Sequence, residues 1–407
     1  MSYRLVEVEL TRAPEPIALG PEDHGLGLIA RWKDRLVGFE MLKLDPGAVL
    51  DAEAVTELAE RKFGARVVAA EIEAELAEAR PAFAASPPSL TVAVCTKDRP
   101  ERLERLLRSL EPVVRDGGGF AAVEVLVVDN APSDERTREA VERLGWPRYR
   151  REPKPGLDFA RNAALNGATG DLLAFLDDDV VVDRGWLSGL HGAWAAWPEA
   201  GGWTGLVLPY ELRTEAQVMF ELRGGFGRGF ERIVHGVEKR DNRLYPVGAG
   251  IFGAGCNMAF DRRLLLELGG FDEALDTGAP LPGGGDLDIF YRVVRSGRPL
   301  VYEPRYAVYH QHRETLEQLR RQYWTWGLGF MAFLVKQMRH DPSLRPRQLG
   351  MLRWWFASMI EAVLWGTKRR LFTEVGFSLA ELWGGVVGLV GEYDRSRARV
   401  RRIREVA

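Results

Sequence analysis

The chain has 407 residues, more than one ordinary domain, so we expect two or three structural units. Hydrophobic residues make up 46% and charged residues 28%, which is typical of a globular protein and excludes a disordered chain. The net charge of -3 gives no overall basis for binding nucleic acid.

The cysteine content and the N-terminal composition indicate in which cellular compartment the protein is found. Cys95 and Cys256 form neither a metal-binding spacing nor a disulfide framework, so we expect a reducing compartment, the cytoplasm. The first ten residues carry charges throughout, which does not fit a secretory signal. No stretch contains eighteen uncharged apolar residues, so no clear transmembrane helix is predicted.

Residues 1–86 form the first predicted unit, a small α+β unit. Its pattern predicts a hairpin that turns at Lys33 and Asp34, and apolar residues at helical spacing predict two helices, 51–63 and 67–79. The prolines in segment 84–89 indicate a linker. This unit holds no catalytic constellation, so we expect an accessory or oligomerisation element, with a homo-oligomer as one outcome.

From Leu90 the chain alternates between predicted strands and helices. Apolar runs predict the strands, and amphipathic runs between them predict the helices, of which 134–144 and 157–168 are the clearest. This alternation predicts an α/β fold with a mostly parallel sheet and helices on both faces. In such a sheet the ligand lies beyond the carboxyl ends of the strands.

Four polar side chains follow the ends of predicted strands: Thr96, Asp98, Asp129 and Asp177. We therefore expect them to share one edge of the sheet. Asp98 is also suited to cap the next helix, with Glu101 completing a capping box, and both roles can coexist.

Three adjacent carboxylates, Asp177, Asp178 and Asp179, lie between two short apolar runs. Like charges repel one another and are costly to desolvate unless a positive charge compensates them. A divalent cation with oxygen ligands is the simplest compensation, and it could also hold a phosphorylated ligand. A solvated acidic turn is the alternative, but the buried flanking strands favour the metal.

Five motifs follow one another along this part of the chain: TVAVCTKDRPERL, VEVLVVDNAPSD, PGLDFARNAALNGATGDLLAFLDDDV, GAGCNMAFDRRLLLELGGFDE and GGGDLDIFYRVVRSG. In these motifs and in their order, over roughly residues 90–313, the chain resembles family 2 glycosyltransferases with the GT-A fold. The resemblance implies a GT-A, Rossmann-like domain over 87–314. It also implies inverting, metal-dependent transfer of a sugar from a nucleotide diphosphate donor, of the UDP or dTDP type, with Mg or Mn.

The resemblance also implies a donor site. Thr96 and Asp98 would line the nucleotide pocket, and Asp129 would face the base. Arg161 would lie near the nucleotide, unless it is a solvated helix charge, and Lys154 could reach a phosphate.

In the same comparison Asp177 and Asp179 match the outer members of a DxD pattern, in which one residue contacts ribose and another the metal. Asn257 follows a glycine-rich loop, 248–255, that we expect to wrap the donor sugar and acceptor, although a merely flexible loop is the alternative. His310 and His312 could add an imidazole to the metal shell, or they could be ordinary surface histidines.

Asp286 aligns with the aspartate of the family's ED motif, the presumed general base that takes the acceptor proton. Gly285 stands where the family has glutamate, which puts an assisting carboxylate in doubt. Asp288 could contact substrate or be the base instead, and both aspartates could simply cap the helix they begin.

Residues 315–407 form a predicted C-terminal helical region rich in tryptophan. Basic clusters at 368–370 and 395–404 lie beside apolar runs. This pattern suits helices on an anionic membrane surface, and equally a bundle packed on the catalytic domain. A saccharide or lipid-linked acceptor, in polysaccharide or glycolipid assembly, is the expected partner, and a lipid-linked one would favour the membrane.

Two other functions stay open on the sequence. A sugar nucleotidyltransferase also uses an acidic metal site on an α/β fold, but it would release pyrophosphate. A catalytically silent sugar-nucleotide-binding or membrane-scaffold protein is the second alternative, which Asp286 argues against and Gly285 mildly favours.

Overall fold

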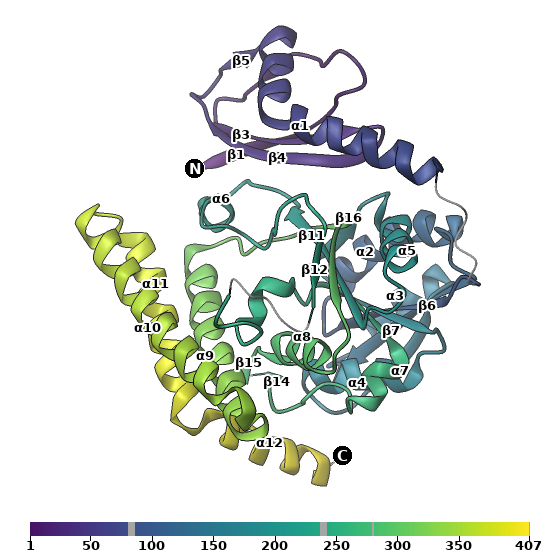
Figure 1. The fold of residues 1–407 in the computed structure, drawn as a ribbon, viewed down its shortest axis with the longest axis vertical. Helices are drawn as coiled ribbons and strands as arrows, with labels where there is room; N and C mark the ends of the chain where they lie inside the picture. Colours follow the sequence, from purple (N-terminus) through teal and green to yellow (C-terminus); the bar gives the residue numbers. More distant parts are fainter. Residues whose placement is uncertain (80–85, 237–241, 279–280, 407) are drawn as a thin grey trace.

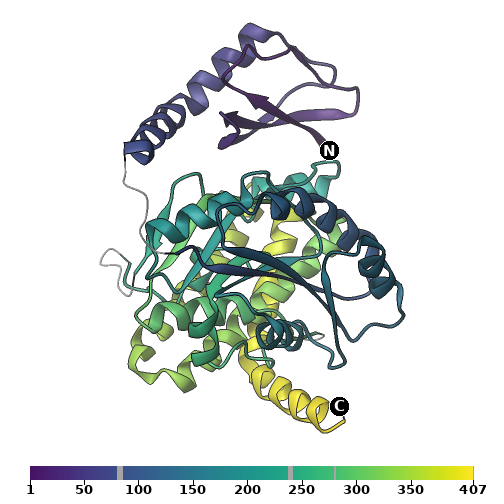
Figure 2. The same cartoon turned by 90° about the vertical axis from the view of Figure 1, so that its right-hand side faces the viewer.

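The computed structural model describes residues 1–79, 86–236, 242–278 and 281–406. A small N-terminal sheet with its helix lies at one end, a large central sheet with helices follows, and the C-terminal helices run along one side (Figure 1). The view turned by 90° shows the N-terminal unit above the central sheet and the C-terminus at the opposite end (Figure 2).

The N-terminal unit is a three-stranded sheet under a long helix. β1 (Ser2–Glu9) runs parallel to β3 (Asp23–Trp32), which pairs antiparallel with β4 (Arg35–Lys43). The predicted turn is confirmed, because Lys33 and Asp34 both have positive φ between these strands. The short strands β2 (Ile17–Ala18) and β5 (Val49–Leu50) form a separate pair.

The two helices predicted in this unit are wrong as separate elements. A single helix, α1 (Ala52–Ala79), spans both stretches. The break was expected near Gly64, but the apolar face continues across it, since Phe63 and Val67 pack in the same cluster against the sheet. The linker predicted at 84–89 falls partly on residues outside the described ranges.

The central sheet has nine strands in the order β10-β16-β11-β13-β9-β6-β7-β8, with β12 paired beside β16, over the described residues. Its strands are β6 (Ser89–Thr96), β7 (Ala122–Asn130), β8 (Arg148–Glu152), β9 (Leu172–Asp177), β10 (Val180–Val182), β11 (Gly202–Pro209), β12 (Ile233–His235), β13 (Asn257–Asp261) and β16 (Leu300–His310).

Strand direction follows the alternation seen in the sequence. β8, β7, β6 and β9 run parallel to one another, as do β11 and β16. β13 runs antiparallel between β9 and β11, and β10 runs antiparallel to β16. The predicted α/β class is confirmed, and the parallel core brings the ends of β6, β7 and β9 to one edge.

Helices cover both faces of this sheet, as predicted. They are α2 (Pro100–Asp116), α3 (Arg136–Leu144), α4 (Leu157–Gly167), α5 (Trp186–Ala196), α6 (Glu215–Leu222), α7 (Arg262–Glu267) and α8 (Gly285–Arg295). One core packs α2 and α5 on the sheet, and a second packs α4 and α8 on the other face. A 3-10 turn, η1 (Ala249–Phe252), and the pair β14 (Asp276–Gly278) and β15 (Leu281–Pro282) lie beside the second core.

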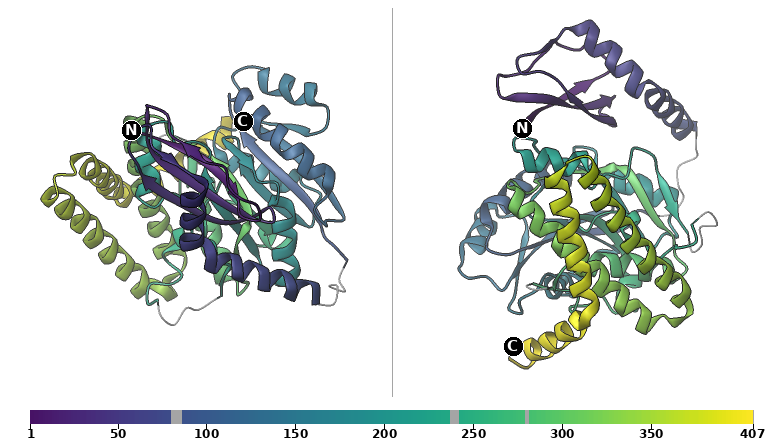
Figure 3. Two further views of the ribbon diagram at one scale, coloured as in Figure 1. Left: turned by 90° about the horizontal axis from the view of Figure 1, so that it is seen from above. Right: turned by 90° about the vertical axis from the view of Figure 1, so that its left-hand side faces the viewer.

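The C-terminal helices are α9 (Leu316–His340), α10 (Arg345–Lys368), α11 (Phe372–Val387) and α12 (Tyr393–Val406), with a short turn η2 (Pro342–Leu344). Figure 3 shows α10 and α11 as a hairpin that stands out from the central domain. By length and composition one described helical run, Phe372–Val406, could cross a membrane, where the sequence showed no uncharged stretch. A third of its apolar window, 33%, is buried, and Val390 and Gly391 interrupt the helix.

Candidate functional site

A cavity of about 1380 Å³ opens where the strands of the parallel core end. Its walls come from the β6 and β9 ends, the loop before β13, the start of α8, and α9, α10 and α11. Seven of the side chains predicted for the site line it: Thr96, Asp98, Arg161, Asp177, Asp179, Asp286 and His310. The other five, Asp129, Lys154, Asn257, Asp288 and His312, do not.

The three adjacent carboxylates have different partners. Asp178 accepts a hydrogen bond from the Thr96 hydroxyl at 2.8 Å and pairs with Arg99 at 3.1 Å. Asp177 has no such partner among the described residues, and burial raises its pKa to about 7, against the attraction of Arg161. Asp178 is therefore structural, as the sequence allowed, while Asp177 is a half-buried carboxylate with no direct hydrogen-bond partner among the described residues.

Asp179 lies in a basic environment. Its Oδ1 is 3.3 Å from His310 Nε2, and Arg102 and Arg313 lie within 4 Å of Oδ2. Burial alone would raise the pKa of Asp179, but His310 and the arginines outweigh it and lower the pKa below its ordinary value. The antiparallel β10–β16 pair sets this geometry, because it places Val180 opposite His310.

The two histidines have separate roles. His310 Nδ1 is 3.0 Å from His312 Nδ1, so Nε2 is the atom of His310 that faces Asp179. His312 Nε2 is 2.7 Å from Glu221 Oε1, and the ring is buried. Burial lowers the pKa of His310 to about 4, which keeps it neutral and able to ligate a metal. His312 is wrong as a metal ligand, because it supports His310 from behind.

Asp98 lines the cavity but does not cap a helix. Its φ is +53°, and its Oδ1 accepts hydrogen bonds from the backbone and hydroxyl of Ser133 at 2.8 and 2.9 Å. α2 begins one residue after Arg99 without a side-chain cap. The predicted capping box is wrong, because the Asp98 carboxylate holds the loop after β7 instead.

Arg161 is a buried charge and not a solvated one. Its Nη1 donates to Asp158 Oδ1 at 3.0 Å and to Asp276 Oδ2 at 3.2 Å. Burial raises the pKa of Asp276 to about 6, although Arg161 opposes that rise. Arg161 thus holds two acids, Asp158 and Asp276, together beside the cavity.

Asp158 was missed by the sequence analysis. A Cβ on Gly285 would lie 2.2 Å from Asp158 Oδ2, so the Asp158 carboxylate occupies the space beside Asp286 where a residue-285 side chain would lie. That Oδ2 has no hydrogen-bond partner among the described residues, and burial raises the pKa of Asp158 well above its usual value. The sequence analysis expected no carboxylate at this place, because residue 285 of α8 is glycine. The structure places the Asp158 carboxylate of α4 there instead.

Asp286 lies in the first turn of α8 and lines the cavity. A Cβ on Gly255 would lie 3.0 Å from Asp286 Cβ, so glycine there permits the loop before β13 to approach it. The prediction that this loop borders the site is consistent with its lining residues Gly253, Ala254 and Gly255.

Asp288 is wrong as a substrate-binding residue or alternative base. It is fully buried, with Arg292 Nε and Lys336 Nζ both at 2.7 Å and Gln337 Nε2 at 2.8 Å. These contacts tie α8 to α9. Two residues apart on a helix, Asp286 and Asp288 point about 200° apart, so they could not share one site.

Asn257 is also wrong as a substrate contact. Its Nδ2 donates to the Tyr306 carbonyl at 2.8 Å, and its Oδ1 accepts from Trp186 Nε1 at 3.0 Å. The side chain is fully buried within the sheet layers. Asn257 therefore stabilises the junction of β13, β16 and α5.

Asp129 and Lys154 are not among the residues that line the cavity. Asp129 is fully buried and accepts the Tyr149 hydroxyl at 2.9 Å. The Lys154 carbonyl accepts from Asn130 Nδ2 at 2.7 Å, and Asn130 Oδ1 accepts from the Gly156 amide at 2.9 Å. Asn130, which the sequence analysis passed over, lines the cavity in the place expected of Asp129.

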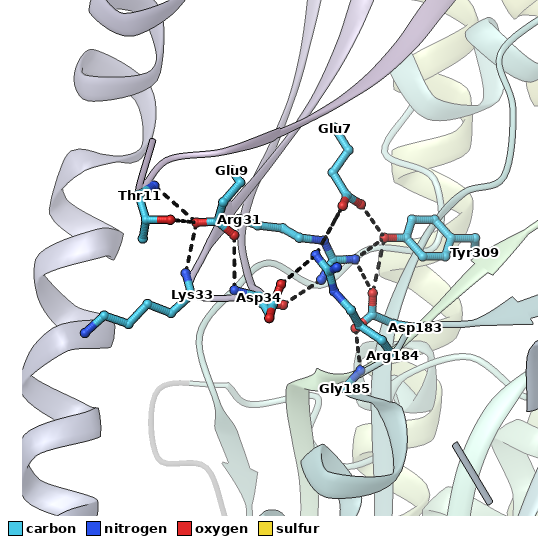
Figure 4. Close-up of polar contacts among 10 residues, drawn as sticks. All are labelled: Glu7, Glu9, Thr11, Arg31, Lys33, Asp34, Asp183, Arg184, Gly185 and Tyr309. Carbon is cyan, nitrogen blue, oxygen red and sulfur yellow. Dashed lines mark hydrogen bonds and ion pairs between the residues drawn. The ribbon is translucent and has the colours of Figure 1, made fainter. Parts of the chain in front are cut away.

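The N-terminal unit contacts the strands that carry two of the site residues (Figure 4). Arg31 is buried against the Asp183 carboxylate, and its guanidinium also donates to the Tyr309 hydroxyl at 2.7 Å and pairs with Glu7 at 2.7 Å. Asp183 follows β10, and Tyr309 lies on β16 next to His310. This contact was not predicted, because a lone arginine in a strand carries no sequence signal.

The described residues do not complete a metal shell by themselves. Among these ranges no three His, Cys, Asp or Glu side chains form a metal-binding group. The chain does bring two carboxylates and a neutral imidazole, from Asp177, Asp179 and His310, to one cavity. Such a donor set fits Mg²⁺ or Mn²⁺ with phosphate oxygens and water as the remaining ligands.

Comparison with known proteins adds the following similarities. Residues 91–233 match the family described as "Glycosyl transferase family 2". The pre-mycofactocin glycosyltransferase of Mycobacterium tuberculosis is 27% identical over 315 residues, covering 73% of this chain and 60% of that protein. The chain therefore spans only about 60% of the length of this relative.

Two further similarities cover different shares of the chain. The succinoglycan biosynthesis protein ExoM of Rhizobium meliloti is 38% identical over 106 residues, which is 25% of this chain and 33% of that protein. The mannosyltransferase PcManGT from Pyrobaculum calidifontis, solved with GDP-Man and Mn²⁺, has a TM-score of 0.47 and 17% identity over 82% of this chain and 93% of that one.

Proposed function

We propose, for a chain whose residues 91–233 belong to glycosyl transferase family 2, that it transfers a sugar from a nucleoside diphosphate sugar to an acceptor hydroxyl. The reaction needs a divalent cation, Mn²⁺ or Mg²⁺, and inverts the anomeric centre. The observation that carries the proposal is the shared cavity that gathers Asp177, Asp179 and Asp286 past the strand ends.

The donor lies on the strand-end side of the cavity. Thr96, Asp98 and Asn130 border the nucleotide, and Arg161 offers positive charge from the cavity floor. A UDP- or dTDP-type donor follows from the family resemblance alone. The roles of these residues are part of the proposal, and their shared cavity supports it.

Asp177, Asp179 and His310 would hold the cation together with the donor diphosphate. A cation there would supply Lewis-acid chemistry, by neutralising charge on the departing diphosphate. The low pKa of His310 supports its part, because a neutral imidazole is available as a ligand at physiological pH.

Asp286 acts as the general base. It accepts the proton of the acceptor hydroxyl while the bond from that oxygen to the anomeric carbon forms. The bond between the anomeric carbon and the diphosphate oxygen breaks at the same time, and the nucleoside diphosphate leaves with the bonding electrons. Attack from the face opposite the leaving group inverts the configuration.

The reaction is tested by incubating the protein with Mn²⁺ and a panel of nucleotide sugars, and separating the nucleotide products. We expect a nucleoside diphosphate from at least one donor of the panel. Pyrophosphate release from a nucleoside triphosphate and a sugar phosphate would identify a nucleotidyltransferase and overturn the proposal. Absence of both donor binding and turnover would favour a silent scaffold.

The α10–α11 hairpin is proposed to rest on an anionic membrane at the cytoplasmic face, which suits polysaccharide or glycolipid assembly. Leu364, Trp365 and Phe372 are exposed at its tip, beside the basic residues 368–370. Apolar and basic side chains on one exposed tip support interfacial binding. Both cysteines are free thiols, which supports a reducing compartment.

A further inference from the structure

The cavity continues past the proposed donor and base into a wall made by the C-terminal helices. Figure 1 shows α9 next to α8, with α10 and α11 on the other side of α9. The wall residues are Gln322, Thr325, Trp326 and Phe330 of α9, Met351, Trp354 and Trp355 of α10, and Glu381 of α11. None of these residues has a part in the proposed donor or metal site.

The wall directly adjoins the proposed base. A Cβ on Gly284 would lie 2.9 Å from the Gly329 carbonyl, so the start of α8 touches α9 at the foot of the wall. Asp286 follows two residues later on α8, Phe330 follows Gly329 on α9, and both line the cavity. A molecule on this wall therefore lies in the cavity that Asp286 lines.

Aromatic rings connect the wall to the metal end of the cavity. The Phe226 ring is 5.1 Å from the His310 ring and 5.8 Å from the Trp326 ring, measured between centroids. The centroids of the Phe330 and Trp355 rings are 6.2 Å apart. Flat apolar surfaces of this kind favour a ligand with an apolar body.

Glu381 is the one carboxylate of this wall in the described part of the chain. Burial raises its pKa to about 7, against the attraction of Arg223. It interrupts an otherwise apolar stretch of α11, where a buried acid is costly without a hydrogen-bond partner. The cost is explained if its carboxyl group hydrogen-bonds a ligand hydroxyl.

The backbone of this residue is fixed by helix packing. A Cβ on Gly327 would lie 2.0 Å from the Glu381 carbonyl, and one on Gly384 would lie 2.0 Å from the Trp324 carbonyl. α9 and α11 therefore pack backbone to backbone, which fixes where the Glu381 side chain leaves α11. At the outer end of the wall Trp354 is 56% exposed, so an apolar ligand can extend out of the cavity there.

We infer that α9, α10 and α11 form an acceptor subsite for a hydroxyl compound with an extended apolar body. The apolar body packs on Trp326, Phe330 and Trp354, a hydroxyl bonds Glu381, and the reacting hydroxyl meets Asp286. This inference rests on the proposed function and deepens it, because it assigns the acceptor class.

The test compares two probes with the same sugar head, n-octyl β-D-glucoside below its micelle concentration and methyl β-D-glucoside. Binding is followed by tryptophan fluorescence and by saturation-transfer NMR, after UDP and GDP binding with Mn²⁺ has been measured separately. We expect at least tenfold tighter binding of the octyl compound, and at least a tenfold loss of that binding in Trp354→Ala and in Glu381→Gln.

The matched control is Trp383→Ala, an exposed tryptophan of α11 outside the cavity lining, which should bind both probes like the wild type. The Glu381 and Trp354 variants should keep their nucleotide affinity and melting temperature. Equal binding of the two probes, or unchanged octyl binding in both variants, overturns the subsite while nucleotide binding persists. Loss of nucleotide binding in the wild type overturns the proposed function instead.

Discussion

At the scale of single residues, the carboxylates of the cavity differ in what surrounds them. Asp178 is paired, Asp179 is compensated by a histidine and arginines, and half-buried Asp177 feels only the attraction of Arg161. Asp286 lies in the first turn of α8. These different environments support the different roles proposed for side chains of the same chemistry.

Asp286→Asn should abolish sugar transfer and leave donor binding nearly unchanged, because an amide cannot take the acceptor proton while its shape is conserved. We expect at least a hundredfold loss of turnover, within the usual contribution of general acid–base catalysis. Turnover is measured by nucleoside diphosphate release and donor affinity by calorimetry. Wild-type turnover in this variant would remove Asp286 from the mechanism.

Cation binding should weaken as the pH falls through 7. Asp177 has a pKa of about 7, so it is mostly protonated at pH 6, and the cation must displace that proton. Apparent Mn²⁺ affinity should be roughly tenfold lower at pH 6 than at pH 8. Electron paramagnetic resonance of free Mn²⁺ measures this change.

Asp177→Asn is the control for that titration. This variant should bind Mn²⁺ more weakly, and its Mn²⁺ affinity should lose most of the dependence on pH. His310 does not contribute in this window, since its pKa of about 4 keeps it neutral at both pH values. An unchanged pH slope in the Asp177→Asn variant would assign the titration to another group.

Gly285 and Asp158 should behave as a coupled pair. Gly285→Ala places a Cβ 2.2 Å from Asp158 Oδ2, and such overpacking costs about 1–3 kcal/mol of stability. Adding Gly285→Ala to Asp158→Ala should cost much less, because the clashing oxygen is gone. Thermal melting of the two single variants and the double variant measures the coupling, and additive effects would contradict it.

At the scale of elements, the β10–β16 pair is held from both ends. Asp179 and His310 lie at its cavity end, and Asp183 and Tyr309 receive Arg31 from the N-terminal unit (Figure 4). The N-terminal unit therefore supports the strands that present two proposed metal ligands. This contact gives a physical role to a unit that holds no catalytic group.

Arg31→Met should destabilise the protein by about 3–5 kcal/mol, because it leaves the buried Asp183 carboxylate uncompensated. Mn²⁺ affinity should fall as well if the strand pair shifts. Adding Asp183→Asn should recover part of the stability. Arg184→Met, which breaks only an exposed pair with Asp34 at 3.1 Å and a longer one with Glu7, is the control and should cost less than about 1 kcal/mol.

The elements could be predicted better than the orientation of their side chains. Alternating apolar runs predicted the parallel core of the sheet. The acidic triplet and Asp286 predicted which residues line the cavity. Apolar periodicity does not reveal which distant residues a side chain contacts. Asn257 and Asp288 were therefore predicted to contact a ligand, whereas Asn257 contacts β16 and Asp288 contacts α9. Helix geometry alone could have separated Asp286 from Asp288.

At the scale of the whole molecule, the C-terminal helices do two things at once. α9 and α11 close one side of the cavity, while the α10–α11 hairpin extends away from it (Figure 3). Trp354 belongs to both regions, since it lines the cavity and is exposed. If both proposals hold, an acceptor with an apolar body would pass along Trp354 between the membrane surface and Asp286.

Replacing Lys368, Arg369 and Arg370 together by glutamine should weaken binding to anionic vesicles roughly a hundredfold, at about 1 kcal/mol for each lost charge. Sedimentation with phosphatidylcholine vesicles, with and without phosphatidylglycerol, measures this. The matched control replaces three exposed arginines elsewhere, Arg115, Arg213 and Arg263, and should bind like the wild type. An equal loss of vesicle binding in both triple variants would indicate that positive charge anywhere on the protein attracts the vesicles, without a defined membrane-binding surface.

The reversed direction of β13 has a practical consequence for altering specificity. The strands beside β13 end at the cavity, so the loops that follow them border it. β13 begins there instead, so the segment that precedes it, residues 242–256, borders the cavity. Grafting a different sequence into that segment would reshape the rim while leaving the sheet's hydrogen-bond ladder untouched. If the proposed sugar transfer holds, this segment is the part of the rim to exchange when the donor specificity is to be altered, because it precedes β13 and takes no part in its pairing.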